Sequence, residues 1–307
     1  MSQVQAPDVV VMIRPHHFRS NPETRSDNAF QTAAEGQNVA DQARDEFDAA
    51  VTELQDAGVQ VHVFEDKSDK TPDSVFPNNW FSAHAGGHVA IYPMFASNRQ
   101  AERRMDVIEM LKRDYRVQDV IDFYGLEADG LALEGTGAMV LDHIERVAYT
   151  VESNRADPVI LERFCTHFGY EPLVFEARDQ QGKRVYHTNV LMGIGTHYAV
   201  ACLDMIVDPT RRAMLRDRLE QSGRHVIDLT EAQIEAFAGN AIELTGNERL
   251  LALSQTAVDA RKPEQIKIIE KTAKLVPLSI PTIETAGGSV RSLLAGVHLT
   301  RRKPRIN

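Results

Sequence analysis

Residues 133–168 read LEGTGAMVLDHIERVAYTVESNRADPVILERFCTHF, and this stretch decides the fold. The apolar runs at 138–142 and 146–151 flank a polar turn, which predicts a β-hairpin. Pro158 then begins a helix that extends to about Phe168, because proline is well placed in the first turn of a helix. The stretch is therefore one hairpin followed by one helix.

Strand and helix signals alternate in the same way on both sides of this stretch. Strands are predicted at 9–14, 59–64, 88–94, 190–194, 198–203, 249–254, 275–280 and 292–299, and helices at 39–54, 101–115, 210–221 and 263–274. The count gives about five units of roughly 50–60 residues, a length typical of arrays of supersecondary units. The pattern predicts a mixed α/β fold, and the arrangement of the units is left open.

The composition excludes several classes of protein. The chain has 307 residues, a formal net charge of −10 and two cysteines, Cys165 and Cys202. Two cysteines do not make a disulfide-stapled secreted scaffold. An acidic chain without blocks of Lys and Arg lacks the electrostatic footprint of a nucleic-acid-binding protein. The apolar run Val9–Ile13 is too short to span a membrane, and it has neither the charged flank nor the cleavage site of a signal peptide.

From this composition we expect a reduced, cytoplasmic protein with no nucleic-acid partner and no membrane partner. No low-complexity segment or long Pro/Gly/Ser linker interrupts the chain, so residues 1–307 are expected to form a single domain. The sequence is compatible with a homo-oligomer and does not specify the oligomeric state.

Polar clusters stand at the ends of the predicted strands. The first, FPNNWF at 76–81, places Asn78 and Asn79 between large aromatic residues. Taken alone, it is equally typical of an ordinary turn. The second, LEGTG at 133–137, carries Glu134 in an apolar setting, where a carboxylate needs a partner. Taken alone, a glutamate that caps a turn explains it as well.

Two further clusters follow. In YHTNV at 186–190, strand geometry would place His187 and Asn189 on the same face, pointing into one pocket. A lone histidine is more often structural than catalytic. In GGSVRSL at 287–293, a glycine pair precedes small polar residues at the start of a strand, and a flexible loop is the alternative interpretation. The histidines show no metal-ligand spacing, so no metal site is expected.

Taken in this order, the four clusters resemble the guanidino-group-modifying superfamily of arginine deiminases, dimethylarginine hydrolases and amidinotransferases. The motifs MIRP (12–15), NAFQ (28–31), LEGTGAMVLD (133–142) and ESNRAD (152–157) are similar to its citrulline-hydrolase branch, also called citrullinase or amidinotransferase-related. No single motif is decisive, whereas the ordered set spans almost the whole chain. The resemblance implies a five-bladed α/β propeller (pentein) of ββαβ-type modules around a central active-site pocket.

The resemblance also implies a catalytic unit. His187 matches the general acid/base, Glu134 the carboxylate that orients it, and Arg155 an arginine that can hold a substrate carboxylate. The nucleophilic cysteine of the family falls at the position of Ser292. Because a serine hydroxyl is much harder to ionise than a thiol, we expect this form to be inactive or very slow. Either a cysteine has been replaced, which the intact remainder of the site favours, or the chain is a naturally silent relative.

The amides favour a neutral substrate. Where deiminases have acidic residues for the guanidinium, this chain has Asn79 and Asn189, and Asn78 is grouped with them as substrate-binding. An amide offers both a donor and an acceptor, which matches a ureido group, whereas carboxylates suit a guanidinium. We therefore predict hydrolysis of citrulline to ornithine, ammonia and carbon dioxide through a covalent cysteine intermediate, without a metal or organic cofactor.

Two alternatives stay open. The first is an arginine deiminase or dimethylarginine-like hydrolase acting on a guanidino substrate, with Glu134 compensating the substrate's charge. The second is a non-catalytic relative that binds an amino acid and has lost the nucleophile. In all three interpretations the partner is a small amino acid, either citrulline or an arginine-like molecule.

Overall fold

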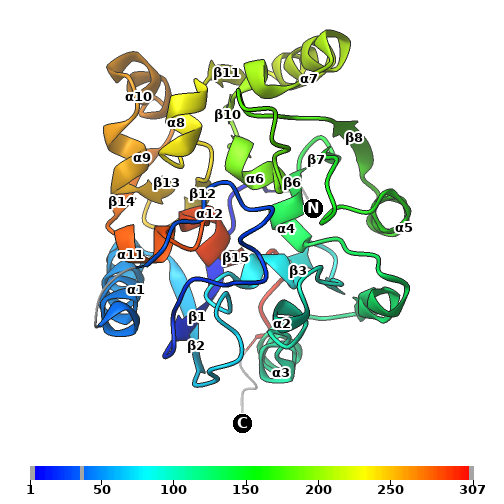
Figure 1. Cartoon of the computed structure of the whole chain (residues 1–307), viewed down its shortest axis with the longest axis vertical. Helices are drawn as coiled ribbons and strands as arrows, with labels where there is room; N and C mark the ends of the chain where they lie inside the picture. Colours follow the sequence, from blue (N-terminus) through cyan, green and yellow to red (C-terminus); the bar gives the residue numbers. More distant parts are fainter. Residues whose placement is uncertain (1–3, 35–37, 304–307) are drawn as a thin grey trace.

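The structure is a computed structural model that describes residues 4–34 and 38–303. Its strands form five three-stranded sheets, which are arranged as blades around a central axis (Figure 1). The blades are β15-β1-β2 (Ala295–Gly296, Val9–Pro15, Gln60–Asp66), β3-β4-β5 (Phe81–His84, His88–Ile91, Asp119–Asp122), β6-β7-β8 (Met139–Asp142, Val147–Val151, Glu171–Phe175), β9-β10-β11 (Met192–Ile194, Tyr198–Ala201, His225–Asp228) and β12-β13-β14 (Ile242–Thr245, Arg249–Ser254, Lys274–Leu278).

Each blade repeats one pattern of strand pairing. The first strand pairs antiparallel with the middle strand, and the third strand runs parallel to the middle one. A parallel pair needs a crossover, which helices supply here on the outside of the ring (Figure 1). These helices are α1 (Val39–Asp56), α2 (Ser97–Gln100), α3 (Met105–Asp114), α5 (Pro158–Phe168), α7 (Pro209–Gln221), α9 (Gln255–Asp259) and α10 (Pro263–Ile269). The prediction of a five-bladed α/β propeller of ββαβ modules is confirmed.

The stretch quoted first shows why one module folds as it does. Asp157 caps α5 by accepting hydrogen bonds from the backbone N–H groups of Val159 and Ile160, and Pro158 occupies the first turn. The helix ends at Gly169, whose φ of 68° is left-handed and therefore favours glycine. Local sequence signals thus fix both ends of the crossover.

Strand β1 shows how the blades pack against their neighbours. Val9 and Val11 pack in the cluster that contains β3 and β4, whereas Val10 and Met12 pack in the cluster that contains β12 and β13. Alternate side chains of one strand thus bury against two different blades. The ring closes where β15 pairs with β1, with Val10 opposite Gly296.

The remaining short helices lie between blades or before their first strands. They are η1 (Pro77–Asn79), η2 (Tyr124–Asp129), α4 (Gly135–Ala138), α6 (Thr188–Leu191), η3 (Leu203–Met205), α8 (Glu231–Glu235), α11 (Pro281–Glu284) and α12 (Val290–Leu293). Within the described ranges, no helix is both long and apolar enough to cross a membrane.

Two of these helices correct the sequence predictions. The strand expected at 190–194 begins only at Met192, after α6, and the strand expected at 292–299 is α12 followed by the two-residue strand β15. His187 is the N-cap of α6, so His187 and Asn189 do not share a strand face as predicted. A four-residue helix is too short to show a 3.6-residue period, which is why apolar residues there read as strand.

Candidate active site

Short elements before the first strands of the blades meet near the axis. The helices η1, α4, α6 and α12 precede β3, β6, β9 and β15, and the turn at 237–241 precedes β12. In this central layer α4 contacts both η1 and α6, and α12 contacts η1. Four of these five elements contain the polar clusters that the sequence singled out, so the fold brings those clusters together.

A cavity adjoins this central layer, and we call it the site cavity. It is lined by Asn28, Asp73, Phe76, Asn79, Arg99, Arg155, Tyr186, His187, Ala286, Gly288 and Ser292. Of the predicted site residues, Asn79, Arg155, His187 and Ser292 line the cavity. Glu134, Asn78 and Asn189 are fully buried and lie outside this lining.

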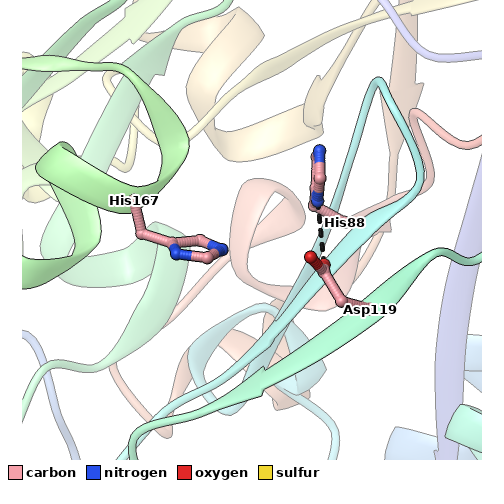
Figure 2. A group of neighbouring side chains, drawn as sticks. All are labelled: His88, Asp119 and His167. Atoms are coloured by element: carbon pink, nitrogen blue, oxygen red, sulfur yellow. Dashed lines mark hydrogen bonds and ion pairs between the residues drawn. The ribbon is translucent and has the colours of Figure 1, made fainter.

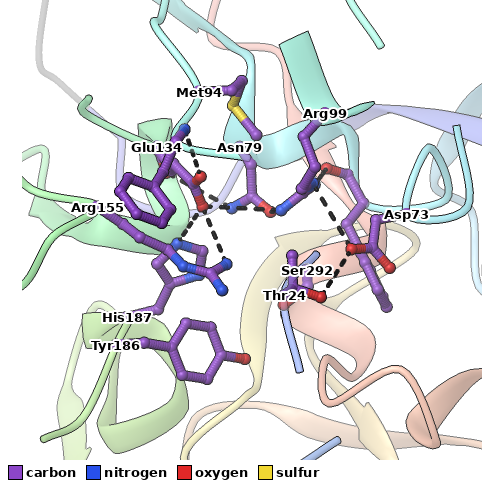
Figure 3. A network of polar contacts seen from close by, with 12 residues as sticks. Thr24, Asp73, Asn79, Met94, Arg99, Glu134, Arg155, Tyr186, His187 and Ser292 are labelled. Carbon is purple, nitrogen blue, oxygen red and sulfur yellow. Dashed lines mark hydrogen bonds and ion pairs between the residues drawn. The ribbon is translucent and has the colours of Figure 1, made fainter. Parts of the chain in front are cut away.

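Glu134 and His187 form a buried pair. The two side chains are joined by a 2.7 Å hydrogen bond between Nε2 and Oε2 (Figure 3). Burial alone would raise the pKa of Glu134, but Arg155, His187 and Arg99 outweigh it and lower that pKa. An ionised carboxylate only accepts, so His187 donates from Nε2 and keeps a lone pair on Nδ1. Burial lowers the pKa of His187 despite the carboxylate, which favours the neutral imidazole at pH 7.

The glycine at 137 lets the imidazole approach the backbone. A Cβ at Gly137 would lie 2.1 Å from Nδ2 of Asn79 and 2.9 Å from Nδ1 of His187. No side chain fits there without displacing one of these two groups. The LEGTG motif therefore serves two purposes: it supplies the carboxylate, and it leaves room for the histidine beside Asn79.

The hydroxyl of Ser292 lies between two amides. Nδ2 of Asn189 donates to Oγ at 3.2 Å and Nδ2 of Asn240 donates at 3.3 Å, while the backbone N–H of Ser292 donates to Oδ1 of Asn240 at 3.4 Å. Two N–H donors directed at this atom would stabilise an anion there, such as the thiolate of a cysteine at position 292. The hydrogen-bond partners of Oγ among the described residues are the amides of Asn189 and Asn240.

Asn240 is a site residue that sequence reasoning missed. It is fully buried in the turn before β12, and it also donates to the backbone carbonyl of Asn189 at 3.1 Å. The signal available was the repeat itself: four of the blades carry a polar cluster before the first strand, and the turn at 237–241 is the fifth such position.

Arg99 was also missed. Its Nε and Nη2 donate to Glu102 at 2.9 and 3.0 Å, and its Nη1 donates to Oδ1 of Asn79 at 3.0 Å (Figure 3). Burial opposes the charge of Arg99, but Glu102, Asp73 and Glu134 outweigh it and raise its pKa. Burial raises the pKa of Glu102 to about 8. Arg99 lies in the four-residue helix α2, and no sequence motif marks it.

Arg155 is already engaged by two carboxylates. Its Nε and Nη2 donate to Asp27 at 2.8 and 2.5 Å, and its Nη1 donates to Oε2 of Glu134 at 3.4 Å. The guanidinium also stacks over the ring of Tyr186, 4.8 Å from its centroid. A ligand carboxylate that binds Arg155 as predicted must therefore share it with Asp27 or displace that side chain.

Asp73 is the acidic residue of the cavity lining, and sequence reasoning missed it too. It is buried, and its Oδ2 accepts a hydrogen bond from Nδ2 of Asn21 at 2.7 Å. Its Oδ1 has no hydrogen-bond partner in the part of the chain that the structure describes. Burial raises the pKa of Asp73, and Arg99, 3.9 Å away, opposes the rise. The cavity thus contains a carboxylate with a free acceptor atom.

The structure does not bring the three predicted substrate-binding amides, those of Asn78, Asn79 and Asn189, together in the cavity lining. Only Asn79 lines the cavity, and its amide oxygen is occupied by Arg99. Asn189 faces Ser292, and the amide of Asn78 is buried with neither polar atom bonded among the described residues. An amide's free atoms depend on tertiary partners, which the sequence pattern could not reveal.

The other reactive side chains lie elsewhere. Cys165 and Cys202 do not line the site cavity, and burial raises the pKa of these thiols to about 12 and about 11. His88, Asp119 and His167 have potential metal-ligand atoms within 4.8 Å of one another, a grouping that sequence spacing did not predict (Figure 2). This trio is also outside the cavity lining.

Comparison with known proteins decides the family. The family model for N,N dimethylarginine dimethylhydrolase, eukaryotic, matches residues 14–299. The chain belongs to this family. The superfamily predicted from the motifs is therefore confirmed, and the dimethylarginine dimethylhydrolases are C–N hydrolases that act on a guanidino substrate. The citrulline-hydrolase branch was not the family matched, and the guanidino alternative is the better supported one.

Solved structures share the fold of this dimethylarginine dimethylhydrolase family member. The N-terminal domain of ArgZ, a cyanobacterial arginine dihydrolase, is 16% identical in a cysteine-to-serine variant bound to substrate, with a TM-score of 0.73 and coverage of 94% of this chain and 97% of that domain. Full-length apo ArgZ is 15% identical with a TM-score of 0.74, over 97% of this chain and 42% of that one.

A third solved structure is the dimethylarginine dimethylhydrolase of Pseudomonas aeruginosa, a cysteine-to-serine variant complexed with citrulline. It is 14% identical with a TM-score of 0.63, over 97% of this chain and 100% of that one. No curated protein matches the chain significantly. At these identities the structural likeness establishes the fold, and the family rests on the family model.

Proposed function

We propose that the chain binds a cationic, arginine-like amino acid in the site cavity, and that the site is that of a guanidino hydrolase whose thiol is replaced by Ser292. The observation that carries the proposal is Asp73, a buried carboxylate in the cavity lining with one oxygen free of hydrogen bonds. A guanidinium or an ammonium group would satisfy that oxygen, because both offer N–H donors and a positive charge.

The charges around the cavity support a cationic ligand. The buried network holds the carboxylates of Asp27, Asp73, Glu102 and Glu134 and the guanidiniums of Arg99 and Arg155. When all are ionised, this network carries two negative charges in excess. With Glu102 protonated, as its pKa of about 8 favours at pH 7, one negative charge remains when Asp73, whose pKa burial also raises, is ionised. A cation entering the cavity balances it, whereas a neutral ureido group leaves it uncompensated.

The hydrolytic step requires a thiol at position 292. In that form, His187 takes the thiol proton, and the thiolate attacks the guanidino carbon. The C–N bond to the departing nitrogen breaks as His187 returns the proton to that nitrogen. His187 then takes a proton from water, whose oxygen attacks the same carbon and releases the thiolate, leaving a ureido product. Glu134 holds the imidazole in the required tautomer, and the amides of Asn189 and Asn240 stabilise the thiolate.

The chain with Ser292 is expected to bind its ligand without turning it over. Cysteine-to-serine variants of two related enzymes hold ligands, the substrate in the cyanobacterial arginine dihydrolase and citrulline in the Pseudomonas aeruginosa hydrolase. We propose that Ser292 occupies the place of those cysteines. Arg155 is the candidate for the ligand carboxylate, after displacement of Asp27.

Isothermal titration calorimetry tests the substrate class directly. Arginine or NG,NG-dimethylarginine should bind the chain about tenfold more tightly than citrulline, a difference of about 1.4 kcal/mol. Asp73→Asn should abolish that preference, because the free acceptor and its charge are lost. Asp69→Asn, on an exposed part of the preceding loop, is the matched control. If citrulline binds more tightly than arginine, and Asp73→Asn binds citrulline with the same affinity as the unaltered chain, the substrate is a neutral ureido compound.

A further inference from the structure

A second cavity adjoins the central layer of short helices. Its lining shares no residue with the site cavity. The first strand of every blade, β3, β6, β9, β12 and β15, contributes to the lining, which places this cavity in the central channel of the propeller (Figure 1). We call it the channel cavity.

Arg291 faces the channel cavity, although its neighbour Ser292 lines the site cavity. Its Nη1 donates to the backbone carbonyl of Leu294 at 3.0 Å. Within the described ranges, no carboxylate lies at ion-pair distance from this guanidinium. Burial lowers the pKa of Arg291 to about 10, so the side chain is still cationic at pH 7. Arg291 is partly buried, and a cation withdrawn in part from water is costly unless an anion or hydrogen bonds compensate it.

Three histidines line the same cavity: the buried His84 and the partly buried His143 and His298. The rings of His143 and His298 lie 4.0 Å apart between centroids, and the charge of Arg291 contributes to the lowered pKa of both. Nδ1 of His143 bonds to the hydroxyl of Tyr170 at 2.8 Å, which leaves Nε2 for another partner. The cation and two imidazoles thus share one region of the cavity.

The acidic residue of the lining, Glu243, does not neutralise Arg291. Its Oε2 accepts hydrogen bonds from the backbone N–H and the hydroxyl of Thr196, at 2.8 and 2.6 Å. The electrostatic partners of Glu243 are Arg249 and His197, and burial raises its pKa. Oε1 of Glu243 has no hydrogen-bond partner among the described residues, and no carboxylate in that part of the chain forms an ion pair with Arg291.

We propose that the channel cavity binds a small oxyanion, a carboxylate or a phosphate, between the guanidinium of Arg291 and the rings of His143 and His298. A guanidinium presents N–H donors in a planar fork that matches two oxygens of such an anion. His143 can donate from Nε2 when Tyr170 donates to its Nδ1, whereas the backbone of Val4 accepts the N–H of a neutral His298, so an anion that binds this ring must displace that contact. Because the two linings share no residue, the anion and an amino acid in the site cavity can be bound together.

Calorimetric titration with sodium acetate and, separately, with inorganic phosphate tests this proposal, with sodium chloride to match ionic strength. Saturable binding of acetate identifies a carboxylate site, and binding of phosphate identifies a phosphate site. Arg291→Gln should weaken binding about tenfold or more. Arg113→Gln, at an exposed arginine, should leave it unchanged. Binding should persist when the chain is saturated with arginine.

A second variant protects the test against misfolding of Arg291→Gln. His298→Gln keeps the cation and should weaken the anion severalfold, while ¹⁵N spectra of the imidazoles in the unaltered chain should show shifts at His143 and His298 when the anion is added. Equal binding by the unaltered chain and both variants would overturn the proposal. So would the absence of binding at tens of millimolar acetate and phosphate, which would leave only water in the channel.

Discussion

The site cavity and the channel cavity adjoin the same central layer, yet the arginine side chains that line them have different partners. In the network around the site cavity, Arg99 is held by Glu102 and Arg155 by Asp27, with Glu134 near both. In the channel, Arg291 is held by a backbone carbonyl. The first network keeps an excess of negative charge and suits a cation, whereas the second keeps a free cation and suits an anion. One step along the chain, from Arg291 to Ser292, separates these two environments.

The largest effect is expected where the site network is broken. Glu134→Gln removes the carboxylate shared by His187, Arg99 and Arg155, which leaves two buried guanidiniums with less compensation. Loss of one partner in a buried ionic network costs about 3–5 kcal/mol in the free energy of unfolding. Urea denaturation measures it, with the exposed Glu152→Gln as control. Equal unfolding midpoints for the two variants would show that the network is not needed for stability.

Acid should destabilise the channel before it affects the site carboxylate. Burial lowers the pKa of His298 from 6.5 to about 4, so its contribution to stability is present above pH 6.5 and is lost as the pH falls towards 4. The shift corresponds to about 3 kcal/mol. The pKa of Glu134 is lowered from 4.5, so its contribution is lost only at more acidic pH.

Unfolding free energies measured between pH 7 and pH 4 check this difference. His298→Gln should flatten the decline across that range, because glutamine takes up no proton. An unchanged slope in His298→Gln would assign the acid sensitivity to other groups and would remove the contrast between the two cavities.

A smaller effect is expected from one methyl group at the site. Gly137→Ala places a Cβ against Nδ2 of Asn79 and Nδ1 of His187, and overpacking of this kind costs about 1–3 kcal/mol. The cost should appear as weaker binding of arginine in calorimetry. Gly125→Ala is the matched control, since a Cβ there meets nothing within 4 Å. If both variants bind arginine like the unaltered chain, the imidazole does not depend on that gap.

The smallest effect is expected at Asn78. Its buried amide has no partner among the described residues and does not line the site cavity, so an apolar group of similar size should be nearly neutral. Asn78→Leu should leave arginine affinity unchanged, whereas Asn79→Ala should weaken it. Loss of affinity in Asn78→Leu would return this residue to the substrate-binding set that the sequence predicted.

The modules could be predicted from the sequence because each has local signals. The hairpin and helix of residues 133–168 carry alternation, a polar turn and Pro158 at the first turn of α5, and the structure reproduces them. The four-residue helices near the axis, such as α6, show no period of their own. The second halves of α6 and α12 were predicted as the beginnings of strands for that reason.

Only part of the site could be predicted from the sequence. The motifs led to Glu134 and His187, and the structure joins them by a hydrogen bond. Asp73 and Asn240 are single polar residues in turns and Arg99 lies in the four-residue helix α2, and only the closure of five blades brings Asp73 and Arg99 to the cavity and Asn240 to Ser292. The citrulline substrate inferred from the amides stays a prediction, and the sequence does not show that Arg99 occupies the oxygen of Asn79.

Activity of Ser292→Cys tests the central claim most directly. The account predicts that this variant converts arginine or NG,NG-dimethylarginine to citrulline, releasing ammonia or dimethylamine, while the chain with Ser292 does so very slowly or not at all. Asp73→Asn in the same background should abolish the reaction. Production of ornithine from citrulline, without turnover of either guanidino substrate, would contradict the account. Inactivity towards all three would make the chain a non-catalytic amino-acid-binding relative.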